Sequence, residues 1–138
     1  MRNFVAAAVQ MTSTEDRDAS LAQAMELIDR AVARGAELVA LPENVDLIGP
    51  QGVKVAAAET LDGPTFELFR KKAADNGVWI LAGSIGEVSQ REGKARNTSV
   101  LFSPTGERVG TYRKMHLFDI DLENGPSSVL QQILVGLA

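Results

Sequence analysis

Apolar residues in the first third of the chain follow a strand, helix, strand pattern. Residues 4–9 are an uninterrupted apolar run, typical of a strand buried on both faces of a parallel sheet. Apolar residues then recur at spacings of four, three and four, which predicts an amphipathic helix that ends at Gly35. These positions are Leu21, Met25, Ile28 and Val32. A second apolar run, residues 38–41, stops at Pro42, so we expect a right-handed crossover between two parallel strands.

Two further helices are predicted in the middle of the chain. Residues 53–59 fit a short helix within a segment that otherwise reads as a loop. Pro64 suits the first turn of a longer helix, and Gly77 suits its end. The apolar residues that share one face of this second helix are Phe66, Phe69 and Ala73.

Three strands are predicted after these helices. Residues 78–85, 97–102 and 108–112 are apolar or alternating runs separated by polar turns, which indicates an antiparallel meander. We therefore expect one layered α/β unit with about five strands and two main helices. Parallel strands at its start and antiparallel strands at its end make the expected sheet mixed.

Composition narrows the classes of function. The chain has 138 residues, a formal net charge of -4 and a sequence pI near 5.0, which argues against a nucleic-acid partner because phosphate backbones are held by clustered Lys and Arg. No apolar run is long enough to span a membrane or to act as a signal peptide, so we expect a cytoplasmic protein without a membrane partner. The chain contains no cysteine, which removes disulfides, thiolate metal sites and cysteine nucleophiles together.

The sequence contains no recognisable motif for binding a cofactor or a metal ion. Gly93-Lys94 is followed by Ala95, where a phosphate-binding loop needs Ser or Thr. One histidine and scattered carboxylates give no recognisable ligand spacing. We expect neither a cofactor nor a metal.

Two segments at strand ends remain as candidates for chemistry, residues 41–44 and residues 112–119. Glu43 in the first is by itself more typical of a solvated loop residue than of a catalytic one. Lys114 in the second is also consistent with a basic surface stretch that contains Arg108, Arg113 and His116. If the fold brings Glu43 and Lys114 together, the two form an acid–base pair.

Five segments together, in their order and separation, resemble the nitrilase superfamily of carbon-nitrogen hydrolases. They are Val9-Gln10-Met11, residues 35–44, residues 79–86, Arg96-Asn97-Thr98 and residues 112–119. The last of these is similar to the amidase branch that contains omega-amidases and deaminated glutathione amidases. The resemblance covers residues 1–127, which we interpret as a partial hydrolase domain.

The resemblance implies the first half of a four-layer α-β-β-α sandwich, with helices on one face of a mixed sheet. It also implies that a small amide is hydrolysed to an acid and ammonia by a glutamate, a lysine and a cysteine. In this chain Glu43 matches the general base, and Lys114 matches the cation that stabilises the oxyanion. No cofactor is implied, because thiolate, base and oxyanion donors suffice for this reaction.

The chain departs from the family pattern at its carboxyl end. The family's cysteine lies on a strand beyond the lysine and is absent here, and residues 128–138 form a divergent apolar tail. We therefore expect a truncated and inactive form of an amidase. One alternative is a noncatalytic module that self-associates through an uncovered sheet face. Another is a small α/β protein unrelated to hydrolases, in which Glu43 and Lys114 are solvated.

Overall fold

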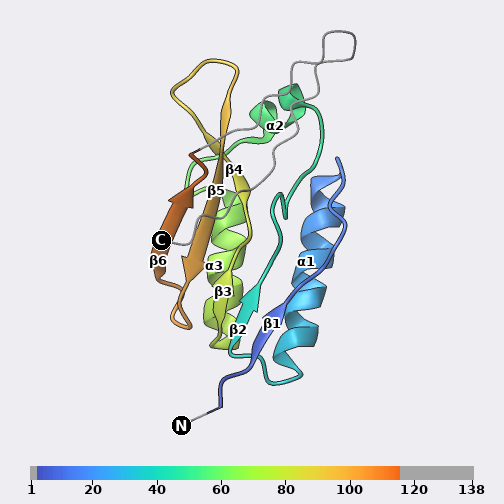
Figure 1. The fold of residues 1–138 in the computed structure, drawn as a ribbon, viewed down its shortest axis with the longest axis vertical. Helices are drawn as coiled ribbons and strands as arrows, with labels where there is room; N and C mark the ends of the chain where they lie inside the picture. Colours follow the sequence, from blue (N-terminus) through green and yellow to red (C-terminus); the bar gives the residue numbers. More distant parts are fainter. Residues whose placement is uncertain (1–2, 116–138) are drawn as a thin grey trace.

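The computed structural model describes residues 3–115, which form one mixed sheet and three helices (Figure 1). The elements in chain order are β1 (Ala6–Ala8), α1 (Arg17–Val32), β2 (Leu38–Ala40), α2 (Gln51–Ala57), α3 (Pro64–Asn76), β3 (Trp79–Leu81), β4 (Ile85–Val88), β5 (Ala95–Phe102) and β6 (Arg108–Arg113). The predicted tail and His116 lie outside the described residues.

The sheet joins a parallel half to an antiparallel half. Strands β1, β2 and β3 pair in parallel, and β5 then pairs antiparallel with both β3 and β4 along one edge. Strand β6 pairs antiparallel with the other edge of β5, so β4, β5 and β6 form the predicted meander. Both the crossover of parallel strands and the mixed sheet are confirmed.

The two long helices begin and end for local reasons. The Asp16 side chain caps α1 by accepting a hydrogen bond from the backbone N–H of Ala19 at 3.0 Å. This helix ends at Val32 with Ala33 as its C-cap, two residues before the predicted stop at Gly35, which has φ +85°. Helix α3 begins with Pro64, and its C-cap residue Gly77 has a left-handed φ of +64° that closes the last turn as predicted.

Helix α2 starts two residues earlier than predicted. Its first turn forms because the backbone N–H of Lys54 bonds to the Pro50 carbonyl at 3.1 Å. The hydrophobic pattern alone did not locate this start, since the first two helical residues, Gln51 and Gly52, are not apolar. Within residues 3–115, no helix combines the length and apolar character needed to cross a bilayer.

Within residues 3–115, α1 and α3 pack against the same face of the sheet. Val39, Ile80 and Phe102 lie in one cross-strand row and are buried in a core that also contains Phe66 and Phe69 of α3. The adjacent row on the opposite face contains Ala40, Leu81 and Leu101, which are half-buried or exposed. The prediction that the first strand is buried on both faces is wrong: β1 is an edge strand in which Ala6 and Ala8 are exposed.

A break divides the predicted strand of residues 78–85 into β3 and β4. Gly83 at the break has φ +60°, and a Cβ atom there would lie 2.0 Å from the Pro42 carbonyl oxygen. The close approach of the loop after β2 therefore requires glycine and prevents a continuous strand.

We predict that Gly83→Ala lowers the free energy of unfolding by about 3 kcal/mol, because both the positive φ and the contact with backbone become strained. Gly52→Ala is the matched control, since its Cβ would meet nothing within 4 Å in α2. Urea unfolding followed by circular dichroism measures both. Equal midpoints for the two variants would contradict this explanation of the break.

Candidate functional site

The loop after β2 carries Glu43 and is fixed to the break between β3 and β4. The backbone N–H of Asn44 donates to the Ser84 hydroxyl at 2.9 Å, and that of Val45 donates to the Ser84 carbonyl at 3.1 Å. Asn44 has φ +52°, a left-handed conformation that asparagine tolerates better than most residues. These bonds hold the backbone on the carboxyl side of Glu43 in one conformation.

Lys114 follows β6 and extends its pairing with β5. Its backbone N–H donates to the Asn97 carbonyl at 2.9 Å, so Lys114 lies opposite Asn97. Because side chains alternate along a strand, Lys114 projects from the opposite face to Arg113. That face is the one opposite the buried core, since Asn97 and Leu101 are four positions apart on β5 and so share a face.

Glu43 and Lys114 meet at this face, together with Asn97. The Lys114 Nζ atom lies 3.2 Å from Glu43 Oε1, and Asn97 Nδ2 donates to the same oxygen at 2.7 Å. The Lys114 side chain is 7% exposed and the Glu43 side chain 17% exposed. The structure thus joins both predicted residues in one largely buried cluster, drawn from three separate parts of the sheet.

Asn97 is a site residue that the sequence did not single out as chemical. It lies within Arg96-Asn97-Thr98, which entered the family resemblance as a motif without a role. A carboxylate only accepts hydrogen bonds, so the asparagine presents its amide NH₂ group to Glu43. The sequence did contain one indication of its role, because Asn97 lies on a predicted strand next to the strand that precedes Lys114.

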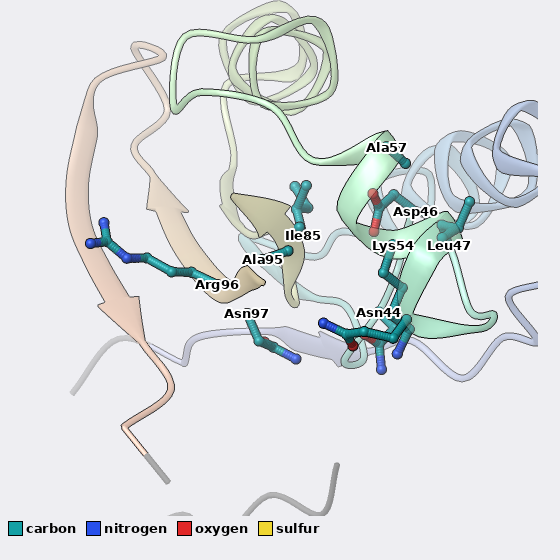
Figure 2. A pocket seen from close by; sticks show the side chains of 11 residues that line it. Asn44, Asp46, Leu47, Lys54, Ala57, Ile85, Ala95, Arg96 and Asn97 are labelled. Carbon is teal, nitrogen blue, oxygen red and sulfur yellow. The ribbon is translucent and has the colours of Figure 1, made fainter. Parts of the chain in front are cut away.

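A shallow pocket borders this cluster between α2, β4 and β5 (Figure 2). Asn44, Lys54 and Asn97 are among its lining residues, and the buried Asp46 lies next to α2. Arg96 extends from β5 away from the other labelled side chains. Asn44, which follows Glu43 in the chain, and Asn97, which bonds to Glu43, therefore give this pocket a polar lining.

On the helical face of the sheet, Glu87 of β4 links the three strands of the meander, β4, β5 and β6. Its carboxylate accepts two hydrogen bonds from the Arg113 guanidinium, at 2.6 and 2.7 Å, and a third from the Thr98 hydroxyl at 2.7 Å. The hydrogen bonds from Arg113 hold the pKa of Glu87 below its ordinary value, and the hydrogen bond from the Thr98 hydroxyl lowers this pKa further. Arg113 is thus anchored to β4, which fixes the strand end that carries Lys114.

Arg108 and Arg113 of the basic sequence stretch are exposed, but each is paired with groups on a neighbouring element. Arg113 is half-exposed but tied to Glu87, and Arg108 bonds to the Leu61 carbonyl at 3.1 Å and lies 3.4 Å from Asp62. Within the described residues, these cations are partners of carboxylates or carbonyls on neighbouring elements. Lys114 differs from them in burial, because its side chain is 7% exposed whereas those of Arg108 and Arg113 are 37% and 44% exposed.

A second charged cluster supports the loop between β2 and α3. Arg17 of α1 forms an ion pair with Glu59, lies 3.6 Å from Asp46 and donates to the Thr65 hydroxyl at 2.5 Å. Glu59 also accepts a hydrogen bond from the backbone N–H of Thr65 in the first turn of α3. Burial raises the pKa of the Asp46 carboxyl, and the charge of Arg17 opposes this shift. The sequence did not indicate this cluster, because its members are far apart along the chain.

Comparison with known proteins assigns the family. The carbon-nitrogen hydrolase model matches residues 5–135 of the chain. The chain belongs to the carbon-nitrogen hydrolase family. The alternative of an α/β protein unrelated to hydrolases is therefore wrong, and the amidase resemblance of the sequence is confirmed at the level of the family.

Individual relatives of this carbon-nitrogen hydrolase chain include two amidases. A deaminated glutathione amidase from Synechocystis sp. is 40% identical over 126 residues, which cover 91% of this chain and 46% of the relative. An omega-amidase from Xenopus laevis is 36% identical over 124 residues, covering 88% and 44%. The C. elegans NitFhit structure has a TM-score of 0.79 and 26% identity, covering 91% of this chain and 31% of that one. The chain thus spans about half the length of the curated relatives it matches.

We predict that Glu87→Gln lowers the free energy of unfolding by about 2 kcal/mol near neutral pH, because Arg113 loses its charged partner. The folded-state pKa of Glu87 lies below its ordinary value of 4.5, so its charge stabilises the fold above that pH. This contribution disappears as the pH falls through the lowered pKa. The difference between wild type and variant should therefore shrink as the pH is lowered below 4.5.

Glu67→Gln is the matched control for this measurement. Glu67 also accepts two hydrogen bonds from one arginine, Arg70, both at 2.6 Å, but that pair is exposed on α3. Solvent screens an exposed pair, so we expect little change in stability. Urea unfolding across a pH series tests both variants. Equal effects of the two substitutions would show that the Glu87 network does not anchor β6.

Proposed function

We propose that this chain supplies the general base and the oxyanion-stabilising cation of an amidase site that hydrolyses a small amide to an acid and ammonia. The observation that carries the proposal is the contact between Lys114 Nζ and Glu43 Oε1 at 3.2 Å on the uncovered sheet face. Family membership and the two amidase relatives support this reaction class.

Glu43 is the proposed general base. Its loop is fixed by the bonds of Asn44 and Val45 to Ser84, and its Oε1 atom is oriented by Asn97 and Lys114. A held carboxylate of this kind accepts the proton of an attacking thiol and then gives it to the departing amine. Water enters next, and Glu43 takes its proton as the thioester is hydrolysed to the acid.

Lys114 is the proposed stabiliser of the tetrahedral oxyanion. Its ammonium is largely buried, in a position fixed through the β5–β6 pairing and the Arg113–Glu87 bonds. A positive charge held in a site with little water stabilises developing negative charge without reorganisation. The nucleophilic thiol is not in this chain, because none of its 138 residues is cysteine.

A chimera that joins this chain to the carboxyl-terminal half of the Synechocystis relative tests these roles. We expect Glu43→Gln to lower kcat by about 10²- to 10⁴-fold, through loss of the base. Lys114→Met should lower kcat by about 10²- to 10³-fold, through loss of oxyanion stabilisation. Ammonia release from a short dicarboxylic monoamide gives kcat and KM for each variant.

The controls for the chimera are an exposed acid and an exposed base. Glu26→Gln on α1 and Lys71→Met on α3 remove the same charges from surface pairs and should leave kcat unchanged. The chain by itself should release no ammonia, because it lacks the thiol. An active chimera that keeps its kcat after Glu43→Gln would refute the proposed role of Glu43.

A second candidate is self-association through the uncovered sheet face. Leu81 and Tyr112 are exposed there, next to half-buried Trp79 and Leu101, which makes an apolar surface on a single side of the sheet. A second copy of the chain would bury this surface symmetrically. This module would be noncatalytic in the absence of a thiol.

We predict that sedimentation velocity detects a dimer that Leu81→Lys dissociates. The matched control is Leu68→Lys on α3, because Leu68 is 37% exposed and Leu81 is 36% exposed. A charge in the apolar face opposes pairing, whereas a charge on the helical side does not. A monodisperse wild-type monomer with cooperative unfolding would exclude this candidate.

A further inference from the structure

Arg17 connects α1 to the loop that carries Glu43 and to the end of α2. Its guanidinium forms an ion pair with Glu59, and its Nη2 atom lies 3.6 Å from Asp46 Oδ2. Its Nη1 atom donates to the Ala57 carbonyl at 3.2 Å. We call Arg17, Asp46 and Glu59 the Arg17 cluster. The proposed mechanism uses none of these three charges, although Asp46 follows the proposed general base by only three residues.

The two carboxylates of the Arg17 cluster are buried and share one cation. Within residues 3–115, Arg17 forms ion pairs with both Asp46 and Glu59. Burial raises the pKa of the Asp46 carboxyl, the charge of Arg17 lowers it, and the charge of Glu59 raises it again. Removal of the guanidinium charge would leave two buried carboxylates that repel each other, which is strongly destabilising for this arrangement. The position of Asp46 therefore depends on Arg17.

Glu59 gives the cluster a fixed point in the sheet. Its backbone N–H donates to the Gly86 carbonyl at 3.0 Å, and its carbonyl accepts from the backbone N–H of Val88 at 3.0 Å. Its carboxylate accepts from the backbone N–H of Thr65, in the first turn of α3, at 2.9 Å. The guanidinium of Arg17 is thus tied to β4 and to α3 through a single carboxylate.

The segment before α1 also binds the loop after Glu43. The Ser13 hydroxyl donates to the Val45 carbonyl at 3.2 Å. The backbone N–H of Ile48 donates to the Thr14 carbonyl at 3.1 Å. These two hydrogen bonds lie on either side of the loop's aspartate, where the guanidinium meets it. The loop is therefore joined to the start of α1 at three adjacent points.

We propose that Arg17 is a positioning residue for Glu43. Its ion pairs with Asp46 and Glu59 hold the loop after β2 where the general base reaches the oxyanion-stabilising lysine. A catalytic side chain must be held within about 0.5 Å of its productive position, and a buried guanidinium with several fixed partners supplies such a restraint. This inference rests on the proposed amidase function, and it adds a residue that touches neither the substrate nor the reacting atoms.

Asn97 reports the position of Glu43 in the full chain without any need for catalysis. Its side-chain NH₂ group donates to Glu43 Oε1 at 2.7 Å, so its ¹H–¹⁵N NMR signals depend on that contact. Glu43→Ala gives the signal shift that corresponds to loss of the contact. We expect Arg17→Met to shift the Asn97 side-chain signals in the same direction. Lower stability of Arg17→Met with unmoved Asn97 signals would reveal a structural role alone and overturn the proposal.

Turnover gives a second readout, in the chimera with the carboxyl-terminal half of the Synechocystis relative. Arg17→Met should lower kcat by at least about tenfold and leave KM nearly unchanged, because a displaced base slows the chemical step without removing a substrate contact. Arg17→Lys should restore most of kcat, since it keeps the charge that both carboxylates need. Circular dichroism checks that each variant is folded, so that kcat refers to folded protein.

Arg70→Met is the matched control for Arg17→Met. Arg70 also binds a glutamate, Glu67, through its guanidinium, but this pair is exposed on α3. We expect unchanged kcat and unchanged Asn97 side-chain signals in Arg70→Met. An equal effect of the two arginine substitutions would show that the Arg17 cluster has no special link to Glu43, and would overturn the proposal.

Asp46→Asn tests the same link in a variant that keeps the Arg17–Glu59 ion pair. It removes only the charge that joins the loop to the cluster, so kcat should fall and the Asn97 signals should shift in the direction set by Glu43→Ala. Asp75→Asn, in an exposed pair on α3, is its matched control and should change neither. Unchanged kcat and Asn97 signals in folded Asp46→Asn would overturn the proposal, even where Arg17→Met fails to fold.

The two readouts separate this inference from the proposed function. The NMR measurement requires neither a thiol nor turnover, so it tests the position of Glu43 alone. Failure of the catalytic role appears as an active chimera insensitive to Glu43→Gln. Failure of the positioning role appears as a chimera that still requires Glu43 but is insensitive to Arg17→Met and Asp46→Asn.

Discussion

The approach of the Pro42 carbonyl to Gly83 is the constraint on which the candidate site depends. No side chain fits at position 83, because its Cβ atom would collide with the carbonyl oxygen. Strand β3 therefore ends, and Ser84 is placed to bind the backbone of Asn44 and Val45. The result is a loop anchored next to Glu43, so that little conformational entropy is lost when its carboxylate meets Asn97 and Lys114.

Alternation along β6 gives two adjacent cations different surroundings. Arg113 projects to the helical face, where Glu87 and Thr98 hold β4, β5 and β6 together. Lys114 projects to the open face and contacts Glu43. A shift of one residue in the pairing of β6 would exchange the two faces. The Glu87 network thus links the stability of the meander to the position of the lysine.

The family assignment, the proposed amidase site and the proposed self-association all concern the open face of the sheet. The chain covers about half the length of its curated relatives, and in the described part α1 and α3 pack on one side of the sheet. The Glu43 cluster and the exposed apolar side chains both occur on the open side. An amide substrate and a second protein surface would therefore approach the same face of the molecule.

The sequence by itself determined the elements whose signals are local. Hydrophobic spacing and glycine stops placed α1 and α3, and the turn residues placed the meander, because these patterns act within a few residues. Glu43 and Lys114 were chosen as candidates because each lies in a family-like segment at the end of a strand. The family resemblance also gave the mixed sheet with helices on one face. Tertiary structure decided what depends on residues far apart in the chain: the break at Gly83, the exposure of β1, the partners of Arg113 and Arg17, and the place of Asn97. Such contacts are set by how the strands pair and how the loops pack, which no local pattern of side chains encodes.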